Sequence, residues 1–203
     1  MEELPRVPEL GADIPRRGNL ITRTAARLIL RLVGWRFEGE LPNFRKAIVI
    51  VAPHTSNWDF LLGVVAMFAL GARFSWLGKR IVFLQPLGLV MRWLGGIPVD
   101  RSAPAGVVEQ IVDEIRMSEK TLLALSPEGT RSPVQRWRTG FWRIAHGANI
   151  PIVPIFFDFG RRVIGITPPF HPTDDIDSDL TTLHKRYDGI TPCRAAGLSQ
   201  PSV

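Results

Sequence analysis

Cysteine is almost absent from this sequence, since Cys193 is the only one among 203 residues. A single thiol excludes an intrachain disulfide and a thiolate metal cluster. Long hydrophobic runs are also missing: stretches without a charged residue, such as 60–72, fall short of the roughly 20 residues that a membrane-spanning helix needs. The first 17 residues contain prolines and glutamates but no apolar segment of the kind found in signal peptides. We therefore expect a cytoplasmic protein, or one bound to a membrane surface, without a transmembrane anchor of its own.

The composition is that of a globular protein with a surplus of positive charge. Hydrophobic residues make up 45% of the chain and charged residues 22%, which argues against global disorder. A length of 203 residues suits one domain with a substantial core. The formal net charge of +6 favours an anionic partner, such as a membrane surface, a phosphorylated small molecule or a nucleic acid. Because no nucleic-acid-binding motif is present, we expect no nucleic-acid partner.

The two ends of the chain differ from its middle. Residues 1–18 contain three helix-blocking prolines and are predicted to be a disordered lead, and residues 188–203 are predicted to be a disordered tail. Residues 19–34 form a predicted basic amphipathic helix, capped by Asn19, with an arginine at every fourth position, Arg23, Arg27 and Arg31. Two interpretations remain open. The helix lies on a membrane surface, which the nearby Trp35 favours, or it packs on the core with a solvated arginine stripe.

The middle of the chain, 35–187, alternates between short apolar runs and amphipathic segments. We predict strands at the apolar runs, 47–52, 74–77, 81–84, 121–125, 152–157 and 163–167. We predict helices at the amphipathic or capped segments, 57–70, 86–94, 107–117 and 180–187. Strands that alternate with helices indicate a single α/β domain with a mostly parallel sheet flanked by helices.

A histidine and an aspartate follow the predicted strand 47–52 in an H-x4-D spacing, His54 and Asp59. On one continuous helix such residues are about 140° apart, so the side chains meet only if His54 precedes the helix and Asp59 lies in its first turn. A carboxylate on one ring nitrogen fixes the tautomer and makes the other nitrogen a base for a hydroxyl proton. The spacing alone is a weak signal, because a single histidine after a strand is more often structural.

Directly after the predicted strand 121–125 comes a second cluster of four residues, Glu128, Gly129, Thr130 and Arg131. In α/β proteins this end of a strand is where ligand contacts gather. The glycine permits an unusual backbone conformation, the arginine can bind a phosphate, and the glutamate can orient a hydroxyl or hold an arginine. The alternative is a tight turn closed by a surface Glu–Arg pair. A third cluster, 95–102, again places an arginine, Arg101, after an apolar segment.

Together these clusters resemble, in order and approximate spacing, the sequence blocks of the PlsC-like lysophospholipid and 1-acylglycerol-3-phosphate O-acyltransferases, within the glycerol-phosphate acyltransferase superfamily. The first block matches at His54 and Asp59, the second at Gly96 and Arg101, the third at 127–132 and the fourth at 150–155. The resemblance covers about residues 35–165. One departure is Ser126, which stands where the family usually has phenylalanine.

The resemblance implies a glycerol-3-phosphate acyltransferase-like fold. It implies transfer of a fatty acyl group from acyl-CoA or acyl carrier protein to the hydroxyl of a lysophospholipid, with 1-acylglycerol 3-phosphate as the leading acceptor. It also implies that His54 is the base, that Asp59 orients it, and that five residues bind the acceptor, Arg101, Glu128, Gly129, Thr130 and Arg131. No metal and no bound cofactor is implied, because the acyl carrier is a substrate.

Several alternatives stay open at this point. An acyltransferase or a transacylase that acts on another lysolipid or on an ornithine lipid fits the same residues. A protein of another class, a non-catalytic one that binds membranes through residues 19–34, fits the charge pattern as well. For either class we expect a location on the inner face of the plasma membrane. The aromatic and basic run 137–142 either lines an acyl or headgroup site or packs as a helix whose arginines reach solvent.

Overall fold

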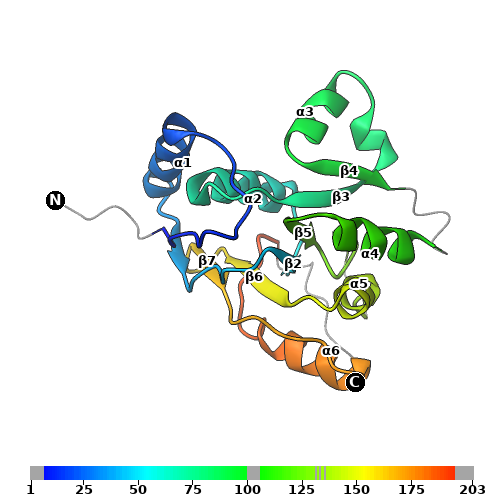
Figure 1. Ribbon diagram of the computed structural model, residues 1–203. Coiled ribbons are helices and arrows are strands. Elements are labelled where there is room, and N and C mark those ends of the chain that lie inside the picture. Colours follow the sequence, from blue (N-terminus) through cyan, green and yellow to red (C-terminus); the bar gives the residue numbers. More distant parts are fainter. Residues whose placement is uncertain (1–6, 100–105, 131, 133, 135, 195–203) are drawn as a thin grey trace.

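A seven-stranded sheet forms the centre of the protein (Figure 1). The computed structural model of the chain describes residues 7–99, 106–130, 132, 134 and 136–194. The strand order is β1-β7-β6-β2-β5-β3-β4, and every neighbouring pair is parallel except β6 with β7. The strands have the bounds β1 Arg36–Glu38, β2 Lys46–Val51, β3 Ser75–Lys79, β4 Gly96–Val99, β5 Thr121–Leu125, β6 Ile152–Asp158 and β7 Val163–Ile166. The predicted α/β class with a mostly parallel sheet is confirmed.

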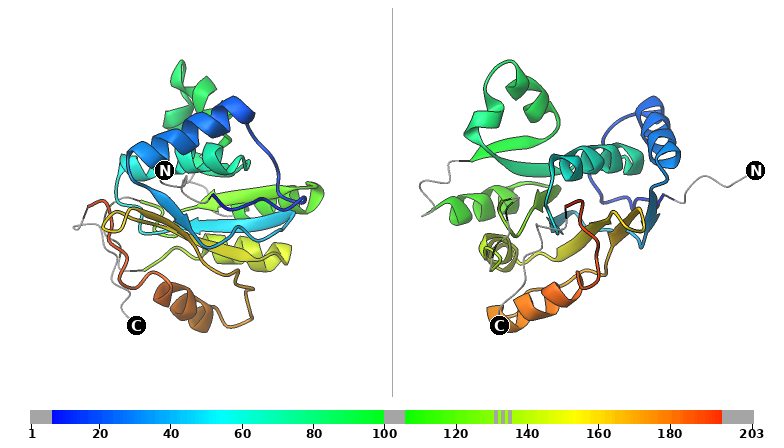
Figure 2. Two further views of the ribbon diagram at one scale, coloured as in Figure 1. Left: turned by 90° about the vertical axis from the view of Figure 1, so that its left-hand side faces the viewer. Right: turned by 180° about the vertical axis from the view of Figure 1, so that it is seen from behind.

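Helices cover both faces of the sheet (Figures 1 and 2). One layer consists of α1 Leu20–Leu32, α2 Asn57–Leu70, the 3-10 helix η1 Arg80–Phe83 and α3 Leu87–Trp93. The opposite layer consists of α4 Val107–Met117, α5 Gly140–Ala148 and α6 Ile176–Lys185. Alternate residues of β2 enter different cores, Val49 on the α1–α2 side and Ile48 and Ile50 on the side of α4 to α6. The unbroken apolar run of β2 is therefore what a strand covered on both faces requires.

One predicted strand is wrong, and three elements were not predicted, the strands β1 and β4 and the helix α5. Residues 80–83 form the 3-10 helix η1, in which Ile81 is exposed and Phe83 is buried against the ring of Trp76. A short apolar run does not distinguish a strand from a helical turn, which explains the error. The unpredicted strand β1 has three residues, of which only one, Phe37, is buried, so it carries no apolar run. The unpredicted helix α5 begins within the aromatic run 137–142.

The chain ends are more ordered than the sequence indicated. Residues 7–18 were predicted to be disordered, but Ile14 is buried in the core, and the backbone around it pairs with residues 71–73. Of the predicted disordered tail, residues 188–194 also pack on the domain: the amide of Phe159 donates to the carbonyl of Thr191. Proline blocks helices but does not prevent extended chain from packing, and that accounts for the lead. Residues 1–6 and 195–203 lie outside the described part of the chain.

Helix α1 packs with two of its arginines towards the protein. Arg27 donates from Nε to the carbonyl oxygen of Ala69 at 3.0 Å, and Arg23 lies over Gly71, so both meet the C-terminal end of α2. The outer face of α1 is instead apolar, with Leu20 78% and Leu32 76% exposed. The helix does pack on the core, through Ala26 and Leu30, but the predicted solvated arginine stripe is wrong for Arg23 and Arg27. Cations at the end of α2 also suit the negative pole of that helix.

Trp35 does not support a membrane contact. It is buried, and its ring meets Phe159 edge to face with centroids 5.0 Å apart. The tryptophan follows the helix in sequence, but its amide bonds back to the carbonyl of Leu30 and turns the side chain into the core. Its position next to α1 in the sequence therefore does not place this ring at a membrane surface.

Candidate active site

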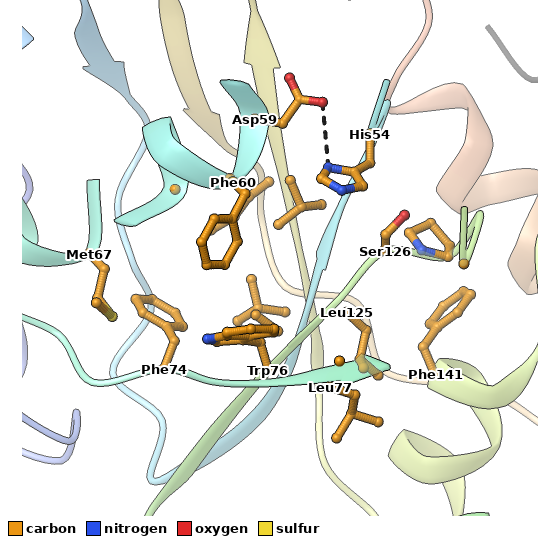
Figure 3. Close-up of a pocket in the computed structure, with 18 of the residues that line it drawn as sticks. His54, Asp59, Phe60, Met67, Phe74, Trp76, Leu77, Leu125, Ser126 and Phe141 are labelled. Atoms are coloured by element: carbon orange, nitrogen blue, oxygen red, sulfur yellow. Dashed lines mark ion pairs between the residues drawn. The ribbon is translucent and has the colours of Figure 1, made fainter. Parts of the chain in front are cut away.

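His54 and Asp59 meet at the carboxyl end of β2. His54 lies in the loop before α2, and Asp59 is in the first turn of that helix, as the spacing required. Nδ1 of His54 is 3.4 Å from Oδ2 of Asp59 (Figure 3). The aspartate side chain is only 1% exposed, whereas the histidine side chain is 22% exposed. A buried carboxylate therefore faces a partly accessible imidazole, with the second ring nitrogen on the far side from Asp59.

The local sequence explains why the aspartate points this way. Ser56 caps α2, and its side chain accepts a hydrogen bond from the amide of Trp58. Oδ2 of Asp59 accepts from the amides of Ser56 and Thr55, each at 2.7 Å, which completes a capping box. The two backbone donors therefore hold Oδ2 of Asp59 at the point where it faces His54.

Glu128 connects the second motif to the first. It follows β5, is buried, and accepts a 2.8 Å hydrogen bond at Oε2 from the backbone amide of His54. The same oxygen lies 3.5 Å from Oγ of Ser126, the residue that replaces the usual phenylalanine. The alternative of a surface Glu–Arg turn is wrong for this residue, because its carboxylate is inside the protein. Glu128 thus positions the loop that carries the histidine.

The next two residues of this motif, Gly129 and Thr130, line the cavity. Gly129 has a φ of +66°, a conformation that favours glycine, and a Cβ there would lie 2.7 Å from Cδ of Arg138. Thr130 lines the adjacent cavity and accepts at Oγ1 from the amide of Ser132. The two arginines predicted to bind phosphate, Arg101 and Arg131, lie outside the described residues.

Arg138 is a site residue that the motifs did not identify. Its amide donates to the carbonyl of Pro127, and its side chain passes Gly129 and lines the same cavity as His54. The available signal was the basic and aromatic run 137–142, for which a headgroup site was one of two interpretations. Trp137 and Trp142 of that run are buried in the core, so the packing interpretation holds for them.

An apolar cavity of about 700 Å³ begins at His54 and Asp59 and extends beneath α2. Figure 3 shows Phe60, Met67, Phe74 and Trp76 along one part of it and Leu125, Ser126 and Phe141 along another. Its polar groups are concentrated at the histidine, where the loops after β2 and β5 converge. An apolar cavity that opens beside one potential base suits a ligand with a long apolar chain and a reactive polar end.

The last described residues also reach the site. Tyr187 donates from its hydroxyl to the carbonyl of Ile50 in β2, and burial raises the pKa of this phenol, so it stays a neutral donor. The amide of Arg194 donates to Oγ1 of Thr55, the residue after the histidine. Both contacts brace the strand and the loop that carry His54, and neither had a signal in the sequence.

Among the described residues, no group of three or more histidine, cysteine, aspartate or glutamate side chains is arranged to hold a metal ion. Within the same part of the chain, no helix is both long and apolar enough to cross a bilayer.

The chain belongs to the acyltransferase family, whose model matches residues 35–158, more than half of the sequence. It is 27% identical to the 1-acyl-sn-glycerol-3-phosphate acyltransferase of Limnanthes alba, over 85% of this chain and 69% of that protein. It is 25% identical to the protein of the same name from Streptococcus pneumoniae, over 69% of this chain and 55% of that protein. The predicted class, a PlsC-like O-acyltransferase of phospholipid biosynthesis, is confirmed.

A solved structure shares the fold. The 1-acyl-sn-glycerophosphate (LPA) acyltransferase PlsC from Thermotoga maritima superimposes with a TM-score of 0.59 at 16% sequence identity. The match covers 82% of this chain and 75% of that one. The predicted glycerol-3-phosphate acyltransferase-like arrangement is therefore confirmed at the level of the fold.

Proposed function

We propose that this chain transfers a fatty acyl group from acyl-CoA or acyl carrier protein to the hydroxyl of a lysophospholipid, with 1-acylglycerol 3-phosphate as the first acceptor. The observation that carries the proposal is the contact between His54 and Asp59 at the mouth of the apolar cavity. The cavity volume falls within the about 300–1,000 Å³ of ordinary ligand pockets. The names of the curated relatives support the acceptor.

The reaction needs one base and no covalent enzyme intermediate. Asp59 holds the Nδ1–H tautomer of His54, so Nε2 accepts the proton of the acceptor hydroxyl. The hydroxyl oxygen forms a bond to the thioester carbonyl carbon, and the carbon–sulfur bond breaks. The leaving thiolate takes the proton back from His54, which yields the ester and a free thiol. A thioester is already activated, and these steps involve neither a metal nor a bound cofactor.

Positive charge beside the cavity suits the acceptor phosphate. Arg138 is the described cation that lines the cavity on the side of Gly129 and Thr130. Arg101 and Arg131 are further phosphate ligands by their match to the family blocks. We assign Glu128 mainly to positioning, because its carboxylate accepts the amide of His54. Guanidinium groups bind phosphate through two parallel hydrogen bonds, which would place the acceptor in a fixed orientation.

The departure from the family pattern at Ser126 concerns the acceptor. The small side chain stands next to Glu128 and lines the cavity where the family usually has an aromatic ring. The smaller side chain leaves more room in the pocket. We therefore include a lysophospholipid with a larger headgroup and a lyso-ornithine lipid as acceptors in the assay, in addition to 1-acylglycerol 3-phosphate. The catalytic pair is the same for each acceptor.

The membrane attachment that we propose uses the outer face of α1. Its exposed apolar residues, Leu20, Ile21, Leu28, Ile29, Leu32 and Val33, share the side of the helix that faces away from α2. Burying such a face in the interfacial region of a bilayer removes apolar area from water. A membrane partner also suits a lipid acceptor, and the inner face of the plasma membrane remains our predicted location.

The test is thiol release from a long-chain acyl-CoA by the purified protein, with and without 1-acylglycerol 3-phosphate. We expect release that depends on the acceptor, and a loss of about 10²–10⁴-fold in His54→Ala and in Asp59→Asn, because the base is removed or misaligned. His146→Ala is the matched control. His146 also contacts an aspartate, Asp174, at 3.0 Å, but does not line the cavity. Wild-type activity in a folded His54→Ala protein would overturn the mechanism.

A further inference from the structure

The segment from η1 to α3, residues 80–93, has large apolar side chains of which about half or more is exposed. We refer to it as the η1–α3 lobe. In Figure 1 it rises beside β3 and β4 on the same side of the sheet as α1 and α2. Its exposed residues are Ile81, Leu84, Leu87, Leu89, Val90 and Trp93. A surface of this kind on a small domain marks an interaction site rather than ordinary surface composition.

The lobe also has a one-sided charge. Between residues 57 and 99 the only carboxylate is Asp59, which is buried at the active site, whereas Arg73, Lys79, Arg80 and Arg92 are cationic and exposed. An apolar convex surface with cations around it matches an anionic bilayer, in which the cations meet headgroups and the apolar residues enter the interface. A second copy of the chain fits less well, because its own cations would face these.

The lobe is fixed to the part of the protein that carries α1. The guanidinium of Arg17 lies over two rings, 5.4 Å from the centroid of Phe68 in α2 and 4.7 Å from that of Trp93 in α3. These two rings are 5.8 Å apart, and Arg17 also donates to the carbonyl of Trp93. Three residues after Arg17 the chain enters α1 at Leu20, and α1 packs on α2. The lobe and α1 are therefore held together on one side of the sheet (Figure 2).

The inner side of the lobe belongs to the site. Val82 of η1 lines the apolar cavity, while its neighbour Ile81 is 70% exposed on the outer side. Lys79, at the end of β3, lines the cavity as well. The lobe is thus the part of the wall that separates the cavity from the exposed apolar surface.

We propose that the η1–α3 lobe is a second membrane-contacting element, which enters one leaflet of an anionic bilayer and, with α1, fixes the orientation of the site towards its lipid substrates. The proposal rests on the proposed function for the identity of those substrates. Contact at two places prevents the domain from rolling about the axis of α1. It also places the cavity wall at Val82 next to the lipid from which acyl chains enter.

The experiment measures membrane depth with a nitroxide on the full chain. In a Cys193→Ser background, one label is placed at Leu89→Cys in the lobe, one at Ile21→Cys in α1 and one at Met117→Cys. Met117 is the matched control, since it is 88% exposed on α4 in the opposite layer. Collision rates with oxygen and with a polar nickel complex are compared with and without vesicles of phosphatidylglycerol and phosphatidylcholine.

We expect the labels at Leu89→Cys and Ile21→Cys to gain oxygen contact at least severalfold relative to the nickel complex, and the label at Met117→Cys to stay in water. A label at Leu89→Cys that stays in water while that at Ile21→Cys inserts would overturn the proposal. So would dimerisation without vesicles that immobilises the Leu89→Cys label. The readout needs no turnover: an inserted lobe without acceptor-dependent thiol release would contradict the proposed function and leave the membrane contact standing.

A second pair of variants covers the case in which a label disturbs the fold. Leu84→Ser with Leu89→Ser should reduce sedimentation with the same vesicles at least tenfold, with circular dichroism unchanged. Met117→Ser should not change it. Equal sedimentation of the double variant and the unmodified protein would also contradict the proposal.

Discussion

The two helical layers of this protein cover the same sheet but differ in what they present outwards. Among the described residues, the exposed large apolar side chains lie on α1, α2 and the η1–α3 lobe or directly beside them, apart from Ile97 on the edge strand β4 and Met117 on α4. The layer of α4, α5 and α6 instead buries Trp142 and Phe141 and leaves polar groups outside. Each layer forms a core with the sheet, so the difference concerns only the outer surfaces.

The charges follow the same division. Residues 14–37 and 57–99 contain ten cations and a single carboxylate, Asp59. In the opposite layer α4 and α6 carry exposed carboxylates, Glu109, Asp113, Glu114 and Asp177. Net charge alone described the chain as basic, whereas the structure shows that one layer carries the basic and apolar surface together. One layer is suited to an anionic lipid surface and the other to water.

The largest expected effect is a difference in stability between substitutions at two neighbouring residues of α1, one on its inner face and one on its outer face. Leu30 is buried and Ile29 is exposed. Leu30→Ala should lower the free energy of unfolding by about 2–5 kcal/mol because it leaves a cavity, while Ile29→Ala should change it by less than about 0.5 kcal/mol. Urea unfolding measures both. Ile29→Ala should instead weaken vesicle binding about tenfold, since each buried CH₂ contributes about 0.8 kcal/mol. Equal destabilisation by the two variants would show that the outer face is packed as well.

The second effect tests which layer holds the acyl chain. Gly63 of α2 lines the cavity, and a Cβ there would have Phe157 as an ordinary neighbour at 3.7 Å. Gly63→Leu should therefore fit without backbone strain and shorten the cavity, and we expect kcat/KM for long-chain donors to fall about tenfold relative to short-chain donors, within the range for misfit of apolar groups. Gly63→Ala is the control and should keep the donor preference. An unchanged preference in Gly63→Leu would place the chain in the part of the cavity lined by Phe141 of α5.

The smallest effect belongs to the opposite layer. The ring of His184 in α6 lies on Trp137 with centroids 3.7 Å apart, and burial lowers the pKa of this histidine, an effect that Asp188 partly offsets. The folded state therefore binds fewer protons than the unfolded state, so stability is complete above about pH 6.5 and falls as the pH drops below it. His184→Gln should reduce the loss of stability in urea between pH 7.5 and 5. The same pH slope in variant and unmodified protein would exclude His184 as the cause.

The sequence predicted the features that depend on local patterns. The buried strands β2, β5 and β6 follow from continuous apolar runs, and α2 and α4 were predicted with the bounds that the structure shows. The contact between His54 and Asp59 could be predicted because helix geometry leaves only one arrangement in which residues at that spacing meet.

Features that depend on contacts between distant segments could not be predicted from the sequence. Nothing local in α1 indicates that Arg27 bonds to the end of α2 and turns the apolar residues outwards, since hydrophobic periodicity gives a face but not its partner. The roles of Tyr187 and Arg194 beside the histidine loop depend on contacts across more than 130 residues. The apolar residues 81–84 misled the strand prediction for the same reason: their environment is outside the sheet.

The capping box of α2 has a consequence for side reactions. Since Oδ2 of Asp59 closes the first turn of α2 and also faces His54, the histidine is aligned whenever the helix is formed. In the mechanism that we propose, the base would therefore be aligned before an acceptor binds. An aligned base can activate water as readily as a hydroxyl of the acceptor, and hydrolysis would waste the thioester. In the mechanism that we propose, the apolar lining of the cavity around Phe60 and Trp76 would exclude water, so the residues that would hold the acyl chain would also decide whether the acyl group reaches lipid or water.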